Sequence, residues 1–566
     1  MRIICERSIS GKIWATDDVV GGADIIDSIL SKRNLADEEA KRIFLNPSLR
    51  EQMPDPFVLL GMDKAVEIVA AAIRFKKKIA IFGDYDVDGI TSTAILIKFF
   101  RIIGADVVWH LPDREIEGYG LNESAIRDFA ACGAKFLLTV DCGITALREV
   151  AVAKELGMSV VVTDHHEPTE ILPDAEAIVN PKQAADKSGL QYLAGVGVAF
   201  MFLVALNREL GHPVSDLMQF LDLVALGTIC DTMPLLGLNR AFVSVGLRVL
   251  EKRRNIGLRV LMEKAAVKRV DVYAAGFILG PRLNAAGRMT DANLALDLIL
   301  TDNFMIANDL AEKLNTMNER RQSIQNAILL NADGAAREQK ESGAFCLFVS
   351  GANWHGGVMG IVAGRLKDKY GLPCCVATSA DGVVSGSGRS IESVDLGGII
   401  RKAMDEKIIT GGGGHAAAVG FELSAENEKK FADFLNGQVS AALNGVLPTP
   451  KIDIDVEIDA GGANLDLATS LSRLAPFGIG NNEPVLSLSG GMWAFGRTMG
   501  GGGHLFGNLR TSAGQLPVVG FNMSDSPVGR FLLDESNFGC IIKVVGKLKE
   551  NDFSGGVQLL LEDASL

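Results

Sequence analysis

The chain has 566 residues, of which 48% are apolar, and this composition supports three or four folded domains and excludes a largely disordered protein. The formal net charge is −13, which counts against nucleic-acid binding because proteins that bind polyanions are usually basic. It does not exclude such binding, since a local basic cleft or bound metal ions can reverse the sign of an acidic pocket.

The pattern of Cys residues and the hydropathy of the chain indicate a cytoplasmic protein. The eight Cys residues include no Cys-x-x-Cys pair, which is typical of a reduced, cytoplasmic protein without a zinc finger. The N-terminal residues MRIICERSIS lack the apolar core of a signal peptide, and no run of about 18 apolar residues occurs. We therefore expect no leader and no membrane span.

The first 300 residues predict a helical segment followed by an α/β domain. Residues 1–45 have a mixed pattern, for which we expect helices, and residues 46–300 alternate helical stretches with short β-rich runs. This alternation favours a parallel, doubly wound sheet. The candidate strands are residues 78–82, 106–109, 136–140, 159–163 and 177–179. Asp or His follows three of them, and we expect these polar side chains to converge where such sheets bind ligands.

The remaining residues predict a long helix and two smaller domains. Apolar residues recur at helical spacing from Ile306 to Ile328, which predicts a helix within residues 301–340. It either connects two lobes or is an ordinary amphipathic surface helix. A second, smaller α/β domain is expected over residues 341–445, with a strand at 345–349. Residues 446–566 are β-rich with many Gly turns, which favours a small β-barrel with one helix near 465–474.

Three carboxylates alternate directly after the first candidate strand, in the segment GDYDVDG. Asp84, Asp86 and Asp88 repel one another at this spacing unless cations neutralise them, and hard divalent cations prefer carboxylate oxygens. The pattern is similar to the start of a calcium loop of the EF-hand type. That interpretation is rejected, because position twelve, where a bidentate Glu is needed, is Ile95.

Three further polar clusters supply possible metal ligands. Asp141 follows one strand, and Asp164, His165 and His166 follow the next, although the chain has only seven His. Asp231 follows an apolar, helix-like stretch. Each cluster alone is compatible with a solvated turn or a helix cap. Together they offer enough oxygen and nitrogen donors for two divalent cations that activate water at a phosphoryl group, and the mixture suits Mn²⁺ better than Mg²⁺.

The second α/β domain contains three Gly-rich, donor-rich segments. Residues 385–390, SGSGRS, present backbone N–H groups and hydroxyls, and Arg389 can bind phosphate with two parallel hydrogen bonds. Residues 354–357, WHGG, and 411–415, GGGGH, are similar in kind. Any one of them is as easily an ordinary loop. Three in one domain favour phosphate or nucleotide binding.

These motifs resemble those of a known superfamily. GDYDVDGITS, DCG, TDHHEP and CDTMPL resemble the four core motifs of the DHH phosphoesterases, in that order and at similar spacing. LPDREIEGYGLN, YLAGVGVAF and GPRLNAAGRM are similar to motifs of the RecJ exonucleases within that superfamily. NWHGGVMGIVAGRL, SGSGRS and GGGGHAAAVGF resemble the DHH-associated domain, and PFGIGNNEPV resembles the opening of an oligonucleotide-binding (OB) fold. The resemblance covers nearly the whole chain.

The resemblance implies a role for each matching residue. It implies that two Mn²⁺ or Mg²⁺ ions are bound by Asp86, Asp88, Asp141, His165 and Asp231. Asp84 would support them, Asp164 would orient a metal-binding His, and His166 would face the scissile phosphate. The implied contacts to substrate phosphate, sugar or base are Arg114, Tyr119, Asn122, Arg288, His355, Ser387, Arg389 and His415.

The implied activity is hydrolysis of single-stranded DNA from its 5′ end, releasing 5′-mononucleotides in DNA repair and recombination. A single-strand-binding protein and a helicase are implied as partners. Two alternatives stay open: a DHH phosphodiesterase for short oligoribonucleotides or cyclic dinucleotides, and a non-catalytic DNA-binding scaffold. Enzymes for short substrates lack the OB module, and scaffolds lose motif acids, so both features of this chain favour the exonuclease.

Overall fold

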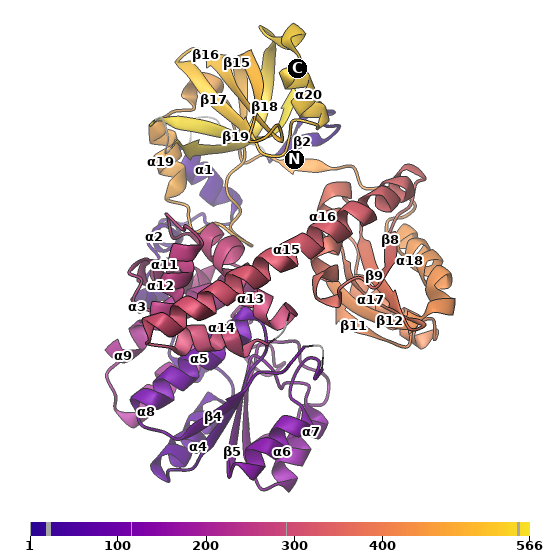
Figure 1. The fold of residues 1–566 in the computed structure, drawn as a ribbon. Helices are drawn as coiled ribbons and strands as arrows, with labels where there is room; N and C mark the ends of the chain where they lie inside the picture. Colours follow the sequence, from indigo (N-terminus) through magenta and orange to yellow (C-terminus); the bar gives the residue numbers. More distant parts are fainter. Residues whose placement is uncertain (1, 18–23, 115, 290, 552–554) are drawn as a thin grey trace. The chain divides into compact units, whose positions relative to one another are not determined.

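The computed structural model describes residues 2–17, 24–114, 116–289, 291–551 and 555–566 (Figure 1). They form two compact units, each described here by itself. The larger unit contains residues 49–233 and 238–448, and the smaller unit contains residues 1–48, 234–237 and 449–566. None of the helices in the described ranges is both long enough and apolar enough to cross a membrane.

A five-stranded parallel sheet is the centre of the first domain of the larger unit, as the sequence predicts. The strand order is β4-β3-β5-β6-β7. Its members are β3 (Ile79–Phe82), β4 (Val107–His110), β5 (Phe136–Val140), β6 (Ser159–Thr163) and β7 (Ala177–Val179). The chain runs outward from β3 to β4 and then returns to β5 on the other side. The carboxyl ends of β3 and β5 therefore flank a topological switch point, where open sheets bind ligands.

Three apolar helices pack close to this switch point. They are α5 (Val87–Ile102), α8 (Gly195–Leu210) and α10 (Leu221–Cys230), and they contact one another. Nearly all residues of each are buried, because helices with apolar residues on every side must be enclosed. The other helices of the domain are α3 (Leu49–Gln52), α4 (Met62–Arg74), α6 (Glu123–Ala131), α7 (Leu147–Glu155), α9 (Ser215–Met218), α11 (Gly237–Glu251), α12 (Ile256–Lys264), the π-helix η2 (Ala274–Leu279), α13 (Gly280–Met289) and α14 (Asn293–Leu300).

The long helix α15 (Phe304–Glu341) connects the two domains of the larger unit. Its 38 residues span about 57 Å at the usual helical rise. The helix contacts α12, α13 and α14 of the first domain, and α16 and β8 of the second (Figure 1). Of the two interpretations of this segment, the connector is therefore confirmed.

The second domain of the larger unit is a smaller α/β layer. Its sheet has the order β11-β12-β10-β9-β8, in which only the β8–β9 pair is parallel. The strands are β8 (Leu347–Ala352), β9 (Cys374–Ala380), β10 (Val383–Arg389), β11 (Gly411–His415) and β12 (Ala418–Ser424). The helices are α16 (Met359–Tyr370), α17 (Leu396–Asp405) and α18 (Glu428–Ala442). The first strand begins two residues later than the sequence predicts.

The smaller unit contains the expected barrel. Strand β15 pairs with both β16 and β18, which closes the five strands on themselves. These are β15 (Leu486–Met499), β16 (His504–Thr511), β17 (Gly514–Gly520), β18 (Ile541–Glu550) and β19 (Val557–Ser565). The unit also contains β14 (Val456–Asp459), α19 (Leu465–Ser472) and α20 (Pro527–Leu533). Helix α19 confirms the helix expected near residues 465–474, and α20 is a second helix that the sequence does not predict.

The N-terminal segment corrects the expectation of helices over residues 1–45. It begins with β1 (Arg2–Cys5) and β2 (Ile13–Thr16), which join β13 (Lys451–Asp453) in a sheet, and only then forms α1 (Ile25–Lys32) and α2 (Glu38–Leu45). Residue 1 and residues 18–23 lie outside the described ranges. The reason is tertiary: buried Asp563 accepts hydrogen bonds from Trp14 Nε1 at 3.0 Å and Ser10 Oγ at 2.7 Å. These contacts fix the extended segment to the far end of the chain.

Candidate active site

The predicted acids and histidines converge at the switch point, because each follows a strand or helix that ends there. Asp86 is the N-cap of α5, where its Oδ1 accepts hydrogen bonds from the backbone N–H groups of Asp88 at 2.9 Å and Gly89 at 3.1 Å. Asp141 follows β5, and Asp164 follows β6. The remaining predicted members lie in the same places: Asp84 after β3, His165 and His166 after β6, and Asp231 at the C-cap of α10.

Asp88 is fixed by the N-terminus of α8. Its Oδ2 accepts the backbone N–H of Gly195 at 2.6 Å, and its Oδ1 accepts that of Val196 at 3.0 Å. Exposed N–H groups at a helix N-terminus favour a carboxylate in this position. Burial nevertheless raises the pKa of Asp88 to about 7, with a further contribution from the neighbouring carboxylate of Asp86. The surroundings of the Asp88 carboxylate thus favour binding of a proton or a metal cation to it.

Asp141 takes a backbone conformation that few residues adopt. Its φ is +61°, in the left-handed region that Asp tolerates better than most side chains. The turn directs its carboxylate at Gly195, where a Cβ atom would lie only 2.3 Å from Asp141 Oδ1. A glycine at the start of α8 is therefore required for the close approach of helix and carboxylate.

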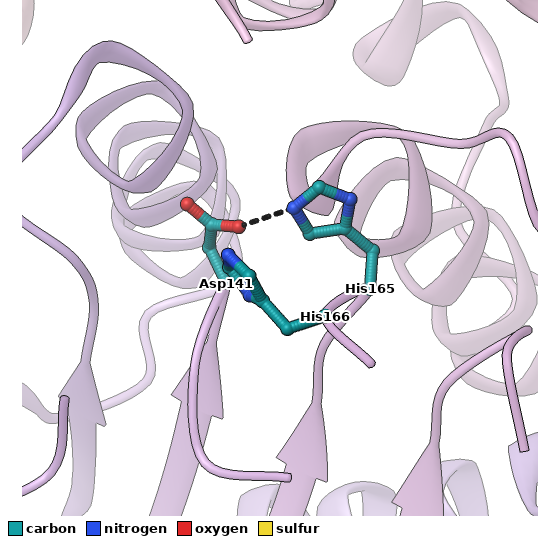
Figure 2. A group of neighbouring side chains, drawn as sticks. All are labelled: Asp141, His165 and His166. Atoms are coloured by element: carbon teal, nitrogen blue, oxygen red, sulfur yellow. Dashed lines mark ion pairs between the residues drawn. The ribbon is translucent and has the colours of Figure 1, made fainter. Parts of the chain in front are cut away.

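His165 presents a ring nitrogen to three carboxylates, of which Figure 2 shows that of Asp141. Its Nδ1 lies 3.0 Å from the Leu193 carbonyl oxygen, an arrangement in which Nδ1 carries the proton and donates it. The distances from Nε2 are 3.1 Å to Asp141 Oδ1, 3.6 Å to Asp231 Oδ2 and 3.8 Å to Asp88 Oδ2. Burial lowers the pKa of His165 to about 3, so the ring is neutral near pH 7. The Nε2 lone pair of His165 and the carboxylate oxygens repel one another, and a cation bound between them would remove this repulsion.

The carboxylates themselves are incompletely satisfied. Asp84 Oδ1, Asp141 Oδ1 and Asp231 Oδ2 are buried and accept no hydrogen bond from any part of the chain that the structure describes. Burial, followed by the neighbouring carboxylates, raises the pKa of all three groups well above the usual range. Buried acids without partners are costly, and bound divalent cations remove that cost.

The ligand atoms form groups of the right size for two cations. Asp88, His165 and Asp231 offer atoms within 4.8 Å of one another, and so do Asp84, Asp86 and Asp141. A third group, Asp141, His165 and His166, overlaps with these. Carboxylate oxygens with one neutral imidazole suit Mn²⁺, and also Mg²⁺. The residues present therefore fit a two-cation site, with Asp84 in a ligand group where the sequence indicates a supporting residue.

Asp164 has a different partner from the one expected of it. Its Oδ1 lies 2.8 Å from His166 Nδ1 and also accepts the backbone N–H groups of His165 at 2.7 Å and His166 at 3.1 Å. The ring of His165 is instead oriented by the Leu193 carbonyl. Burial alone would lower the pKa of His166, but the hydrogen bond to Asp164 and the nearby acids raise it. The hydrogen bond to Asp164 therefore favours the protonated form of His166.

The loop between β4 and α6 carries Arg114 and Tyr119 to this site. The Tyr119 hydroxyl lies 3.2 Å from the His166 ring nitrogens, and its ring meets that of Tyr85 edge to face, with centroids 6.4 Å apart. The Arg114 guanidinium lies over the Tyr85 ring, 5.6 Å from the centroid. Two predicted substrate residues thus lie beside the predicted proton donor.

The same loop contains a residue that the motifs did not indicate, Glu117. Its Oε2 lies 2.8 Å from His110 Nε2 and accepts Asn122 Nδ2 at 2.6 Å, while its Oε1 accepts the backbone N–H of Asp113 at 3.2 Å. The Oδ1 atom of Asn122 also caps α6 by accepting the Ala125 N–H at 2.9 Å. Both polar atoms of the Asn122 amide are thus engaged within the chain, so the structure gives Asn122 the task of holding this loop. A single Glu in a polar segment carries no signal of this role.

Three of the predicted arginines influence one another, although they come from separate segments. The pKa of Arg288 is lowered to about 10, first by burial and then by the charges of Arg114 and Arg321. Burial and Arg114 also lower the pKa of Arg389. An anion such as phosphate suits this group of guanidinium groups, because it would offset the repulsion between their charges.

Of the other predicted substrate residues, His355 lies near Arg288, Ser387 lies on the strand of Arg389, and His415 lines a cavity with His166. Arg288 Nη1 donates to the Gly357 carbonyl at 2.9 Å, and His355 Nδ1 accepts the Gly357 N–H at 3.1 Å. Ser387 lies two residues before Arg389 on β10, hence on the same face of the sheet. A cavity of about 600 Å³ is lined by Tyr119, Gly120, Leu121, Gly143, Ile144, Thr145, Ala146, Glu149, Asp164, His166, Glu167, Gly414 and His415.

Three known domain families match the chain in this order. The DHH family, N-terminal domain, matches residues 78–228, the DHHA1 domain matches residues 342–441, and the RecJ OB domain matches residues 454–563. The first match contains the acids and histidines of the candidate metal groups, apart from Asp231, which lies three residues beyond it. The second contains Ser387, Arg389 and His415, and the third is the closed barrel.

Two relatives named single-stranded-DNA-specific exonuclease RecJ are similar along most of their length. The one from Bacillus subtilis is 33% identical over 573 residues, covering 100% of this chain and 71% of the relative. The one from Salmonella typhimurium is 35% identical over 448 residues, covering 75% and 77%.

Solved structures agree with these relatives. The crystal structure of RecJ from Thermus thermophilus in complex with Mn²⁺ matches with a TM-score of 0.81 and 29% identity, over 97% of this chain and 78% of that chain. A structure of exonuclease RecJ bound to manganese has 33% identity and a TM-score of 0.60, over 69% and 97%. On the strength of the three domain matches and of relatives matched over most of their length, this chain belongs to the RecJ family of DHH proteins.

Proposed function

We propose that this chain is a metal-dependent exonuclease specific for single-stranded DNA. The observation that carries the proposal is the lone pair of neutral His165, which faces the carboxylates of Asp88, Asp141 and Asp231. Such a group holds divalent cations, and the arginines of the two domains lie where a phosphate is expected. Relatives with this name, and solved relatives with Mn²⁺ or Mg²⁺, support the same conclusion.

In this proposal Mn²⁺ or Mg²⁺ is held by Asp86, Asp88, Asp141, His165 and Asp231, with Asp84 beside them. When bound, two such cations activate a water molecule and neutralise charge on the phosphoryl oxygens. The protein's own residues bind the phosphate and supply a proton.

The protein's own part is to hold the phosphate and to supply a proton. Arg114, Arg288 and Arg389 bind the phosphate oxygens, and Ser387, His355 and His415 add donors. His166, held by Asp164 at 2.8 Å, donates a hydrogen bond to the oxygen on which charge develops. Tyr119 lies against His166 and contacts the substrate, and Asn122 keeps their loop in place through Glu117.

We further propose that cleavage proceeds from 5′ to 3′, releases 5′-mononucleotides and serves DNA repair and recombination. We propose the cytoplasm as the site of action, where a single-strand-binding protein and a helicase supply the substrate. Residues 46–300 are the catalytic DHH domain, 301–340 the connecting helix, 341–445 the substrate-binding domain and 446–566 the DNA-holding OB domain. The matched domain families and the connecting helix support these limits.

The decisive test uses a single-stranded oligonucleotide labelled at one end and incubated with Mn²⁺ or with EDTA. In Mn²⁺ we expect mononucleotides to be released from the 5′ end. We expect no release in EDTA, and none from the variant Asp141→Ala. Brisk cleavage of dinucleotides without cleavage of long strands would instead identify a phosphodiesterase for short substrates. Tight binding of DNA without any cleavage would identify a scaffold.

A further inference from the structure

Two exposed aromatic rings outside the metal site are stacked on each other. Tyr273 and Phe277 are 64% and 70% exposed, with ring centroids 5.4 Å apart and planes only 17° from parallel. Large aromatic side chains usually bury their apolar surface. An exposed pair held in parallel therefore indicates a surface that receives another flat, apolar group.

The rings belong to a helical segment that reaches the metal centre. Its inner face contacts α10, because Cys230 Sγ lies 3.8 Å from the Ala275 carbonyl oxygen and a Cβ on Gly280 would fall 2.5 Å from Cys230 Sγ. Farther along, Asn284 Oδ1 accepts the backbone N–H of Val87, between Asp86 and Asp88, at 3.2 Å. The rings and the catalytic acids are thus connected by one rigid element.

That element is π-helical where the rings emerge. The π-helix η2 occupies Ala274–Leu279, and such turns are rare and occur frequently at functional sites. Tyr273 and Phe277 are four residues apart at its start, and both rings are exposed, whereas Ala274, Ala275 and Leu279 of the same segment are buried.

The segment that leads to the rings is rich in positive charge, although the chain as a whole is acidic. Residues 251–277 contain seven Lys or Arg and three Asp or Glu, in a chain of net charge −13. Arg253 Nη2 donates to the Val267 carbonyl at 2.9 Å, which joins the end of α11 to the segment that leads to Tyr273. The exposed cations Lys252, Arg254, Lys268 and Arg269 form no ion pair with any residue within the described ranges.

We propose that Tyr273 and Phe277 form a stacking platform for bases of the single strand on the 3′ side of the cleaved 5′ end, with Lys268 and Arg269 on its phosphates. This inference rests on the proposed function. Parallel rings with unpaired cations suit single-stranded nucleic acid of any sequence, whereas a protein partner has no need of both features. From Phe277 to Arg288 the helix rises about 16 Å, which corresponds to about five stacked nucleotides.

The test compares Tyr273→Ala/Phe277→Ala with Phe75→Ala, which removes a ring that is 76% exposed elsewhere on the larger unit. Binding of a fluorescent 20-nucleotide strand is measured by anisotropy in EDTA, and kcat/KM of this strand and of a trinucleotide is measured in Mn²⁺. Loss of stacking on one base corresponds to roughly five- to 150-fold in affinity. We therefore expect the ratio of long-strand to trinucleotide kcat/KM to fall about tenfold in the double variant alone.

Two further variants separate stacking from folding and from charge. Tyr273→Phe/Phe277→Tyr keeps both rings and should keep the wild-type ratio. Lys268→Glu/Arg269→Glu should weaken long-strand binding and reduce the slope of log affinity against log salt by about 1.4, since each phosphate contact on a single strand contributes about 0.7.

The outcomes are distinct. Equal ratios in the double Ala variant and Phe75→Ala would overturn the platform, as would an equal loss on both substrates. A change in self-association or in capture of a partner protein, with unchanged strand binding, would also overturn it. Wild-type binding of the 20-mer without cleavage, lost in the double Ala variant, would reject the proposed function but support the platform.

Discussion

Replacing Gly195 by Ala should disable the metal site while leaving the fold intact. The added Cβ would lie 2.3 Å from Asp141 Oδ1 and 2.7 Å from its Cγ, whereas real Cβ atoms keep at least 3.0 Å. The helix start or the carboxylate must therefore move by about 0.7 Å or more. Because the Gly195 N–H also holds Asp88 at 2.6 Å, either movement disturbs two ligands together. A misplacement on the order of 1 Å costs roughly 100-fold in rate, and displaced ligand support costs roughly 10–100-fold in metal affinity.

The same helix provides a matched control, two residues farther on. A Cβ at Gly197 would meet nothing closer than Leu193 Cδ2 at 3.4 Å, an ordinary contact. Gly197→Ala should therefore keep activity and gain up to about 1 kcal/mol from helix propensity. The assay is exonuclease rate against Mn²⁺ concentration for both variants, with thermal unfolding as the check on folding. Equal half-saturating Mn²⁺ and equal maximal rates in the two variants would refute the argument.

Two further predictions concern stability. Asp222, buried in the first turn of α10, has its pKa raised to about 6 by burial. The stability it contributes is therefore present below pH 4 and lost as pH rises through about 6, a loss of up to roughly 3 kcal/mol in total. About half of this loss falls between pH 5 and pH 8, and Asp222→Asn should remove that part in urea unfolding at these two pH values. A steeper pH dependence in the variant would contradict this. Mn²⁺ at about 1,000 times its Kd should stabilise the larger unit by about 4 kcal/mol, seen as a higher Tm than in EDTA, and Asp141→Ala should abolish most of the rise. An undiminished rise in that variant would place the ion elsewhere.

The sequence predicts the catalytic sheet well because its physical signals are local. A parallel strand buried on both faces is a short apolar run, and the functional residue follows where the run ends. Asp141 after β5 and Asp164 after β6 illustrate this. Spacing alone thus predicts which side chains meet, although they are far apart along the chain.

What the sequence could not predict depends on contacts between distant segments. The strands of the N-terminal segment exist because Trp14 bonds to Asp563, a partner that no local pattern reveals. The ring of His165 is oriented by the backbone carbonyl of Leu193, and backbone atoms have no signature in a sequence. Glu117 acts only because its loop folds back on itself. In each of these cases the role of the residue depends on which atoms the fold brings next to it, and the residue type alone does not reveal it.

Part of the acidic net charge lies at the candidate metal site. Asp84, Asp86, Asp88, Asp141 and Asp231 are concentrated at the strand ends, where two divalent cations would cancel most of their charge. Arg114, Arg288 and Arg389 remain, repelling one another in a partly buried place. With cations bound, the site is therefore attractive to phosphate, and without them it is repulsive. Metal should accordingly govern binding of the strand's end as well as its cleavage, so a sum over the whole chain says little about affinity for a polyanion.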